Sequence, residues 1–167
     1  MTPAPCKAPR INEAKIFGVT PGNQFLFTIA ATGVRPVHFS AEGLPRGLKL
    51  DSKTGIITGR ISQKGVYFSI LKAKNKFGES IKKLKIIAGD AISLTPPIGW
   101  NGWNAWADDL DGVKVMASAN AMVARGLADH GWSYVNIDDT WQGRRGGKYN
   151  ALQPNEKFPA FKEMVDH

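Results

Sequence analysis

The sequence of 167 residues contains a single cysteine, Cys6. One cysteine excludes an intrachain disulfide and any metal site built from several cysteines. The chain also lacks an apolar run long enough to span a membrane. Met1 is followed by Thr-Pro-Ala-Pro-Cys instead of a basic segment and an apolar core. We therefore expect no membrane span and no secretory signal in the chain as given.

Acidic residues are scarce in the first half of the chain. Residues 1–90 hold 15 Lys or Arg against 5 Asp or Glu, a balance of +10, whereas residues 91–167 hold 7 against 9, a balance of −2. The five tryptophans divide the other way, since all of them lie within residues 98–141. This uneven distribution favours two domains of different kinds.

The basic first half raises the question of a nucleic-acid partner or an acidic membrane surface. Its lysines alternate along expected strands and form no patch motif, and the aromatic interleaving of single-strand binders is absent. A solvated lysine-rich sheet face explains the charge better. We expect no nucleic-acid partner.

A helical period of useful length is absent from residues 10–90. Instead, Phe25, Phe27 and Ile29 alternate with Leu26, Thr28 and Ala30, and short runs such as 66–73 and 81–88 are separated by Gly-rich turns. Short strands at this spacing predict a β-sandwich. His38 lies in one of these strands with no acid or nucleophile motif nearby, so we interpret it as structural.

Two glycine-rich elements mark this first half. They are Gly43-Leu-Pro-Arg-Gly-Leu48 and Thr54-Gly-Ile-Ile-Thr-Gly59. With them, nearly all of residues 10–90 resembles the immunoglobulin-like modules attached to bacterial glycosidases and surface proteins. The resemblance implies a spacer or support. Because Thr95-Pro96-Pro97 disfavours helix and makes a rigid connection, we expect a boundary near residue 92, with domains 1–92 and 93–167.

The second half is expected to begin with one βαβ unit over residues 97–138. Apolar residues at 3.6-residue spacing predict a helix over 111–129 that Gly131 closes, and residues 132–137 form an apolar run typical of a buried strand. A second helix is expected from Ala160. Trp100, Trp103 and Trp106 lie at spacing three among asparagines; Trp100 suits a core, and the run as a whole suits a platform for a sugar ring.

Asp138 and Asp139 end the expected strand 132–137. Loops at the carboxyl ends of buried strands line ligand sites in α/β folds, but an acidic pair can also cap a turn, and from these residues alone both readings stay open. Asp108, Asp109 and Asp111 precede the expected helix, where negative charge is favourable. They lack the spacing of a calcium loop, so we expect no metal.

The run Leu94-Thr-Pro-Pro-Ile-Gly-Trp-Asn-Gly-Trp-Asn104, followed by a helix and by Asn136-Ile-Asp-Asp-Thr-Trp141, resembles the opening of glycoside hydrolase family 27, the α-galactosidases and their relatives. The resemblance implies the first, incomplete quarter of a (β/α)8 TIM barrel and a secreted or periplasmic protein without a cofactor. It also implies that Trp103, Asp138 and Asp139 bind the terminal sugar. Gly102 departs from a usual serine, and Thr140 from a frequent cysteine or glycine.

The same resemblance places both catalytic aspartates beyond His167, so no catalytic residue is expected in this chain. We predict the amino-terminal portion of a retaining glycosidase that hydrolyses terminal α-galactosides and is inactive by itself. The alternative is a non-catalytic carbohydrate-binding or adhesive fragment. Nucleic-acid binding rests on charge alone and ranks last. The sequence does not give the oligomeric state.

Overall fold

The structure is a computed structural model that describes residues 6–167. Its contacts divide the chain into two units, Met1–Pro97 with Ala128–Gly131, and Ile98–Leu127 with Trp132–His167. We call them the sandwich unit and the βαβ unit. None of the helices in residues 6–167 is both long and apolar enough to cross a membrane.

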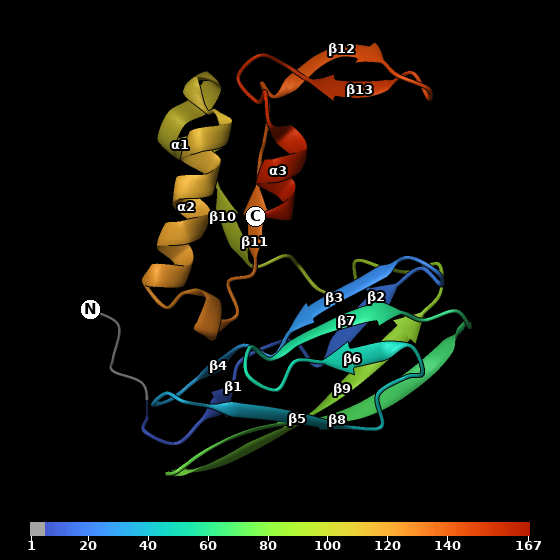
Figure 1. The fold of residues 1–167 in the computed structure, drawn as a ribbon, viewed down its shortest axis with the longest axis vertical. Coiled ribbons are helices and arrows are strands. Elements are labelled where there is room, and N and C mark those ends of the chain that lie inside the picture. Colours follow the sequence, from blue (N-terminus) through green and yellow to red (C-terminus); the bar gives the residue numbers. More distant parts are fainter. Residues whose placement is uncertain (1–5) are drawn as a thin grey trace. The chain divides into compact units, whose positions relative to one another are not determined.

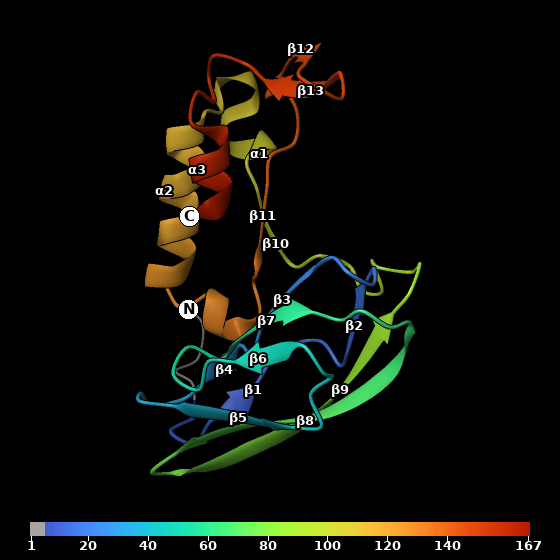
Figure 2. The same cartoon turned by 45° about the vertical axis from the view of Figure 1, so that its right-hand side comes forward.

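The sandwich unit consists of two sheets and a short strand pair, shown as separate layers in Figure 1 and Figure 2. The four-stranded sheet has the order β2-β9-β8-β5, the three-stranded sheet has the order β3-β7-β6, and β1 pairs with β4. The strands are β1 Arg10–Ile11, β2 Ile16–Val19, β3 Gln24–Thr28, β4 Ala31–Thr32, β5 His38–Glu42, β6 Leu48–Leu50, β7 Ile56–Arg60, β8 Gly65–Asn75 and β9 Gly78–Ala88. The turn η2, Ala128–His130, groups with this unit.

The period-2 pattern decides which side chains enter the core between the two sheets. On β3, Phe25 and Phe27 are buried while Leu26 is 59% exposed, as the alternation predicts. Leu84 and Ile86 of β9 are fully buried from the other sheet. Phe17 adds edge-to-face contacts, with its ring centroid 5.1 Å from that of Phe25. The predicted all-β sandwich is confirmed.

Strands β8 and β9 form the longest antiparallel pair, in register from Gly65 opposite Ala88 to Asn75 opposite Gly78. Both extend beyond the predicted runs 66–73 and 81–88. The turn between them is short, and the side chain of Asn75 accepts a hydrogen bond from the backbone N–H of Phe77 at 2.8 Å. This local bond lets the ladder continue to the turn.

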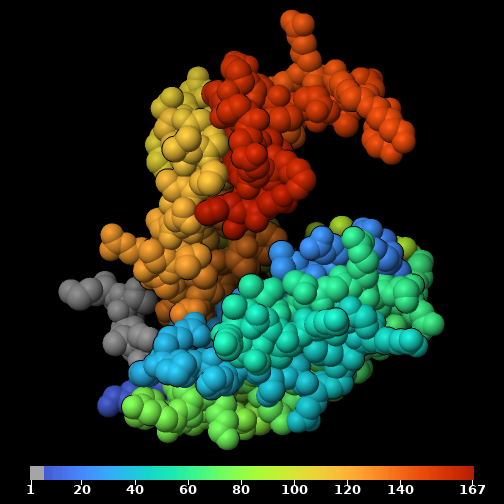
Figure 3. Space-filling view, in the orientation of Figure 1, coloured from blue at the N-terminus to red at the C-terminus, as the bar shows by residue number. Residues whose placement is uncertain are grey.

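The βαβ unit contains two parallel strands, three α-helices and an antiparallel hairpin that precedes the last helix. Its elements are β10 Gly99–Asn101, α1 Trp103–Trp106, η1 Ala107–Asp109, α2 Gly112–Ala124, β11 Tyr134–Asn136, β12 Gln142–Gly146, β13 Ala151–Pro154 and α3 Phe161–Asp166. β10 and β11 pair in parallel across α2, which confirms the predicted βαβ order. In Figure 3 the red α3 segment lies against the yellow and orange α2 segment. A small buried cluster of Leu110, Val115 and Phe158 forms the core.

The helix predicted over 111–129 ends earlier, at Ala124. Gly126 has φ +76°, its N–H donates to the carbonyl of Val123, and the N–H of Leu127 donates to that of Met122. This is a Schellman closure, which a glycine with positive φ makes possible. The prediction chose Gly131 and passed over Gly126. His130 lies beyond the end of α2, in the turn η2.

Two further expectations need correction. The strand expected over 132–137 is shorter, Tyr134–Asn136, and Trp132 lies before it with 42% of its surface exposed. The antiparallel hairpin of β12 and β13 was not predicted, because its first strand carries two arginines between glycines and shows no apolar alternation. The second helix was expected from Ala160 and begins at Phe161.

Candidate functional site

The carboxyl ends of β10 and β11 bring the predicted site residues together. Asn101 is the last residue of β10 and pairs in register with Asn136, the last residue of β11. Asp138 follows two residues later, and its Oδ2 accepts a hydrogen bond from Asn101 Nδ2 at 2.9 Å. Parallel pairing puts both strand ends at one edge of the sheet, so side chains 37 positions apart in sequence meet there.

Asn101 also positions Trp103. Its Oδ1 accepts a hydrogen bond from the backbone N–H of Trp103 at 2.9 Å, where α1 begins. The amide therefore holds the carboxylate of Asp138 with its nitrogen and the start of α1 with its oxygen. Asn101 was not among the predicted site residues, although its position in the Trp-Asn-Gly-Trp run was the available signal.

The three tryptophans at spacing three do not form one platform. Trp100 and Trp106 contact each other edge to face, with ring centroids 5.6 Å apart, and pack against the buried cluster around Leu110. Trp103 is 39% exposed. Of the three rings, only Trp103 is left outside the packed cluster, so the platform expected from the spacing is not formed by all three.

Gly102 fills a place that has no room for a side chain. A Cβ atom built on Gly102 would lie 2.8 Å from Cη2 of Trp100 and 2.9 Å from Cδ2 of Leu110. Real Cβ contacts are not this short, so a serine at this position would displace the ring or the leucine. Glycine at position 102, where the family resemblance led us to expect serine, therefore fits the close packing of Trp100 and Leu110.

Asp139 is exposed and makes a local bond. Its Oδ1 accepts the backbone N–H of Thr140 at 2.7 Å. Thr140 has φ +63°, an unfavourable value for a β-branched residue, and its carbonyl accepts Asn155 Nδ2 at 2.7 Å. Strained backbone next to a polar strand end is typical of ligand sites. The local bond of Asp139 also fits the turn-capping reading, which stays open for this residue.

Asn155 and Trp141 fix the segment that follows the two aspartates. The carbonyl of Trp141 accepts the backbone N–H of Asn155 at 2.9 Å, and the Trp141 ring stacks on Phe161 with centroids 5.3 Å apart. Both ends of the β12–β13 hairpin are therefore held at the point where the aspartates lie.

One of the acidic residues before α2 caps this helix. Asp111 is its N-cap, and its Oδ1 accepts the backbone N–H of Lys114 at 2.8 Å. This backbone bond, with the Lys114 ammonium 2.9 Å from Oδ2, holds the pKa of Asp111 below its usual value. The hydrogen bond to Asp111 in turn raises the pKa of Lys114. Asp108 and Asp109 lie in η1, before the helix.

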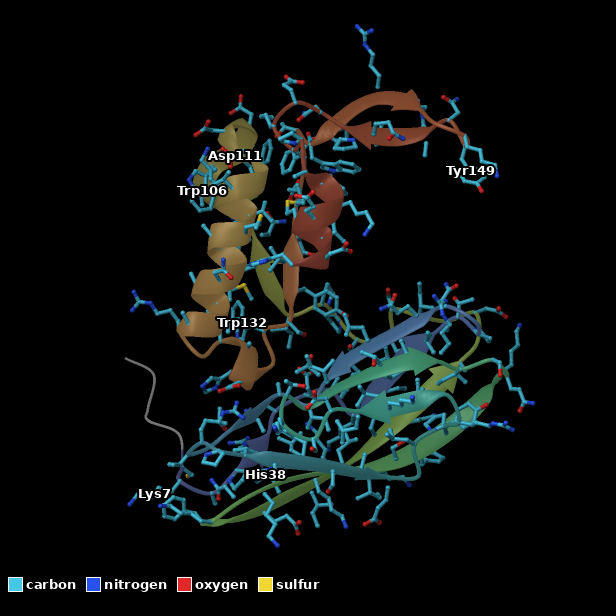
Figure 4. The ribbon with its side chains drawn as sticks, viewed as in Figure 1. Lys7, His38, Trp106, Asp111, Trp132 and Tyr149 are labelled. Carbon is cyan, nitrogen blue, oxygen red and sulfur yellow. The ribbon has the colours of Figure 1, made fainter. Side chains whose placement is uncertain are left out.

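Within residues 6–167, no group of three or more His, Cys, Asp or Glu side chains is placed to hold a metal ion. His38 lies on β5 opposite Lys74 and is exposed, as Figure 4 shows for the labelled side chain.

Comparison with known proteins agrees with this organisation. Residues 8–87 match the family described as "Putative Ig domain". These residues are similar to an immunoglobulin-like module. The expected resemblance of the first half is confirmed.

Curated proteins with a similar sequence include α-galactosidases. The chain is 40% identical over 77 residues to a probable α-galactosidase B of Penicillium simplicissimum, which covers 44% of this chain and 18% of that protein. It is 36% identical over 83 residues to an α-galactosidase of Coffea arabica, covering 48% of this chain and 22% of that one. The chain spans about a fifth of the length of these curated relatives.

Two solved structures match along almost the whole chain. A putative α-galactosidase from Bacteroides fragilis is 45% identical with a TM-score of 0.89, and the match covers 99% of this chain and 36% of that one. A putative α-galactosidase/melibiase from the same organism is 43% identical with a TM-score of 0.86, covering 95% and 34%. The predicted resemblance to α-galactosidases is confirmed.

Proposed function

We propose that this chain is the amino-terminal part of a retaining glycoside hydrolase that acts on terminal α-galactosides. The observation that carries the proposal is the Asn101–Asp138 hydrogen bond at the carboxyl ends of two neighbouring parallel strands, beside the exposed ring of Trp103. The similar proteins are named α-galactosidases, which supports glycoside hydrolysis as the reaction and α-galactose as the sugar. The βαβ unit would be the first quarter of a (β/α)8 barrel, with a domain boundary near residue 92.

In this proposal the named residues hold the sugar and do no bond chemistry. The Trp103 ring offers an apolar face to the pyranose, and the carboxylates of Asp138 and Asp139 accept hydrogen bonds from its hydroxyls. Asn101 orients Asp138. A retaining mechanism needs two further carboxyl groups about 5 Å apart, one as nucleophile and one as acid and base. We place both in the remainder of the protein.

The chemistry calls for no cofactor, because two carboxyl groups and water suffice for glycoside hydrolysis. The 167-residue chain alone should therefore be inactive while the full-length protein turns over p-nitrophenyl α-galactoside. Hydrolysis by the purified, sequence-verified chain would contradict the proposal. A full-length protein that binds galactosides without hydrolysing them would favour the adhesive alternative. A secreted or periplasmic location stays a prediction.

The roles of the aspartates are tested in the full-length protein by Asp138→Asn and Asp139→Asn. Losing a charge-assisted hydrogen bond of on the order of 1.5–3 kcal/mol should lower kcat/KM about ten- to a hundredfold. Asp108→Asn, at an exposed carboxylate of η1, is the matched control and should change neither kcat/KM nor Tm. If the pair only caps a turn, both variants should lose Tm and keep kcat/KM, which would refute the sugar-binding role.

A further inference from the structure

The β12–β13 hairpin, residues 142–154, carries charge of one sign only. It contains Arg144, Arg145 and Lys148 and no Asp or Glu. All three side chains are exposed. The hairpin, which we call the basic hairpin, is therefore a local cationic surface within a half of the sequence whose overall balance is negative.

These cations have no acidic partner in the part of the chain that the structure describes. The ion pairs of residues 6–167 use other basic residues, such as Lys114 with Asp111 and Lys162 with Asp166. Arg145 only reaches the carbonyl of Asn150 at 3.4 Å, and the Lys148 ammonium lies 5.3 Å from the centroid of the Tyr149 ring. Like charges held together without an acid repel one another, so an anionic ligand would relieve an existing cost.

The basic hairpin starts at the proposed sugar site. Gln142 is three residues after Asp139 and pairs with Pro154, and the Asn155–Trp141 bond closes the base. At roughly 3.4 Å per extended residue, Arg144 lies within about 17 Å of Asp139. This reach covers the sugar residues that follow a terminal one held at the aspartates.

The tip of the basic hairpin presents an aromatic ring that packs on no core. Tyr149 is 81% exposed and lies at the end of the hairpin in Figure 4. Figure 3 shows the same segment, in orange, as an arm that extends from the unit. A flat ring with the Lys148 ammonium 5.3 Å from its centroid can stack on a sugar, while the cations of the same hairpin bind anionic groups along the glycan.

We propose that the basic hairpin binds anionic sugar residues on the leaving-group side of the substrate, so that the preferred substrate is a neutral α-galactose carried on an acidic glycan. The inference rests on the proposed function. Two carboxylates at Asp138 and Asp139 would repel an acidic sugar placed between them, whereas the hairpin attracts one further along. The acidic strand end and the basic hairpin would therefore place the neutral galactose at the aspartates and the acidic residues at the hairpin.

The kinetic test compares α-galactosyl trisaccharides in the full-length protein. Their second and third residues are galactose, galacturonic acid or galactose sulfate. We expect a higher kcat/KM for the acidic substrates, and Arg144→Gln with Arg145→Gln should reduce it about threefold to tenfold while the neutral trisaccharide is unaffected. Raising the salt concentration should have the same selective effect. The acidic trisaccharide whose kcat/KM falls more in the double variant, the galacturonate or the sulfate, identifies the anionic group that the hairpin prefers.

Matched variants separate charge from structure. Arg144→Lys with Arg145→Lys should restore most of the preference, and Arg46→Gln with Lys49→Gln, which removes two exposed cations of the sandwich unit, should leave it unchanged. An equal loss on neutral and acidic substrates would overturn the proposal, because it would show a structural role of the hairpin.

A binding measurement keeps the inference separate from the proposed hydrolysis. Calorimetry with trigalacturonic acid, which has no galactose to cleave, should show binding that the Arg144→Gln, Arg145→Gln variant loses. Equal affinity for the neutral trigalactose, or tighter binding of a single-stranded DNA oligonucleotide, would overturn the hairpin proposal whatever the hydrolysis result. Absence of p-nitrophenyl α-galactoside hydrolysis would instead overturn the proposed function alone.

Discussion

The sandwich unit and the βαβ unit differ most in the number of large apolar side chains that they bury. In the sandwich unit, large residues such as Phe25, Ile57 and Leu84 are fully buried between two sheets. The fully or nearly fully buried cluster of the βαβ unit is small, while Val113 and Val123 of α2 stay 77% and 69% exposed. The sandwich unit also exposes apolar side chains, such as Leu26 at 59% and Ile81 at 58%, so the two units differ chiefly in the size of the buried core that each one builds.

This difference fits the extent of the related structures. The chain spans only 36% of the matching Bacteroides fragilis structure, so most of that structure has no counterpart among these residues. The polar strand end of the βαβ unit, in contrast, is already assembled. The proposed sugar-binding edge and the larger buried core therefore lie in different stretches of the sequence.

The largest effect should appear when the units are separated. We expect limited proteolysis to cut within residues 91–97, which are mostly exposed, and to leave the sandwich as a protected fragment with a cooperative melting transition. The fragment beginning at Ile98 should not melt cooperatively, because it leaves sheet edges unpaired. Mass spectrometry and circular dichroism measure both. Recovery of a protected fragment 98–167 with the sandwich digested would reverse the comparison.

A smaller effect on stability should come from replacing one buried phenylalanine with alanine, and it should depend on the unit that contains the phenylalanine. Phe25→Ala should reduce the free energy of unfolding of the sandwich by about 3–5 kcal/mol, while the neighbouring exposed Leu26→Ala should change it by less than about 0.5 kcal/mol. Phe158→Ala should leave the sandwich transition unchanged. All five tryptophans lie in the βαβ unit, so their fluorescence in urea reports on that unit and circular dichroism reports mainly on the sandwich.

A shift of the sandwich transition by Phe158→Ala would show that the two units unfold together, which would contradict the predicted independence of the sandwich.

The smallest effect concerns a turn of the sandwich unit. The backbone N–H groups of Thr54 and Lys53 donate to Asp51 Oδ1 at 3.0 and 2.8 Å and hold the pKa of Asp51 below its usual 3.8. A lowered folded-state pKa stabilises the fold above the unfolded value, and this contribution is lost as the pH falls through the folded value.

The stability advantage of the parent over Asp51→Asn should therefore shrink from about pH 5 to about pH 2 in urea unfolding of the sandwich. Asn keeps an acceptor for the turn, whereas Asp51→Ala removes it and should be less stable than Asp51→Asn throughout. An advantage that stays constant with pH would show that Asp51 does not titrate differently in the folded state.

Much of the sandwich could be predicted because its signals are local. Alternation of Phe25, Leu26 and Phe27 states which face is buried, and glycines mark the turns between strands. The end of α2 was misplaced because Gly126 and Gly131 both have positive φ, and only the three-dimensional hydrogen bonds show which one closes the helix.

The site was predicted less completely. Trp103 and Asp138 were selected by the family resemblance, and their meeting at one strand edge follows from the parallel pairing. Asn101 was missed because its role depends on a partner 37 residues away. The basic hairpin was missed since nothing in a Gly-Arg-Arg-Gly sequence indicates a strand.

The parallel pairing of β2 with β9 gives the sandwich a mechanical property. Ile16 pairs with Lys85 and Val19 with Ala88, in a unit whose other strand pairs are antiparallel. A pulling force that draws the chain backward from Ile16 and forward from Ala88 loads these hydrogen bonds along the strands, in shear, so they must break together. An antiparallel pair pulled from one end would open one bond at a time. The module is therefore suited to bear tension between whatever is attached at its two ends.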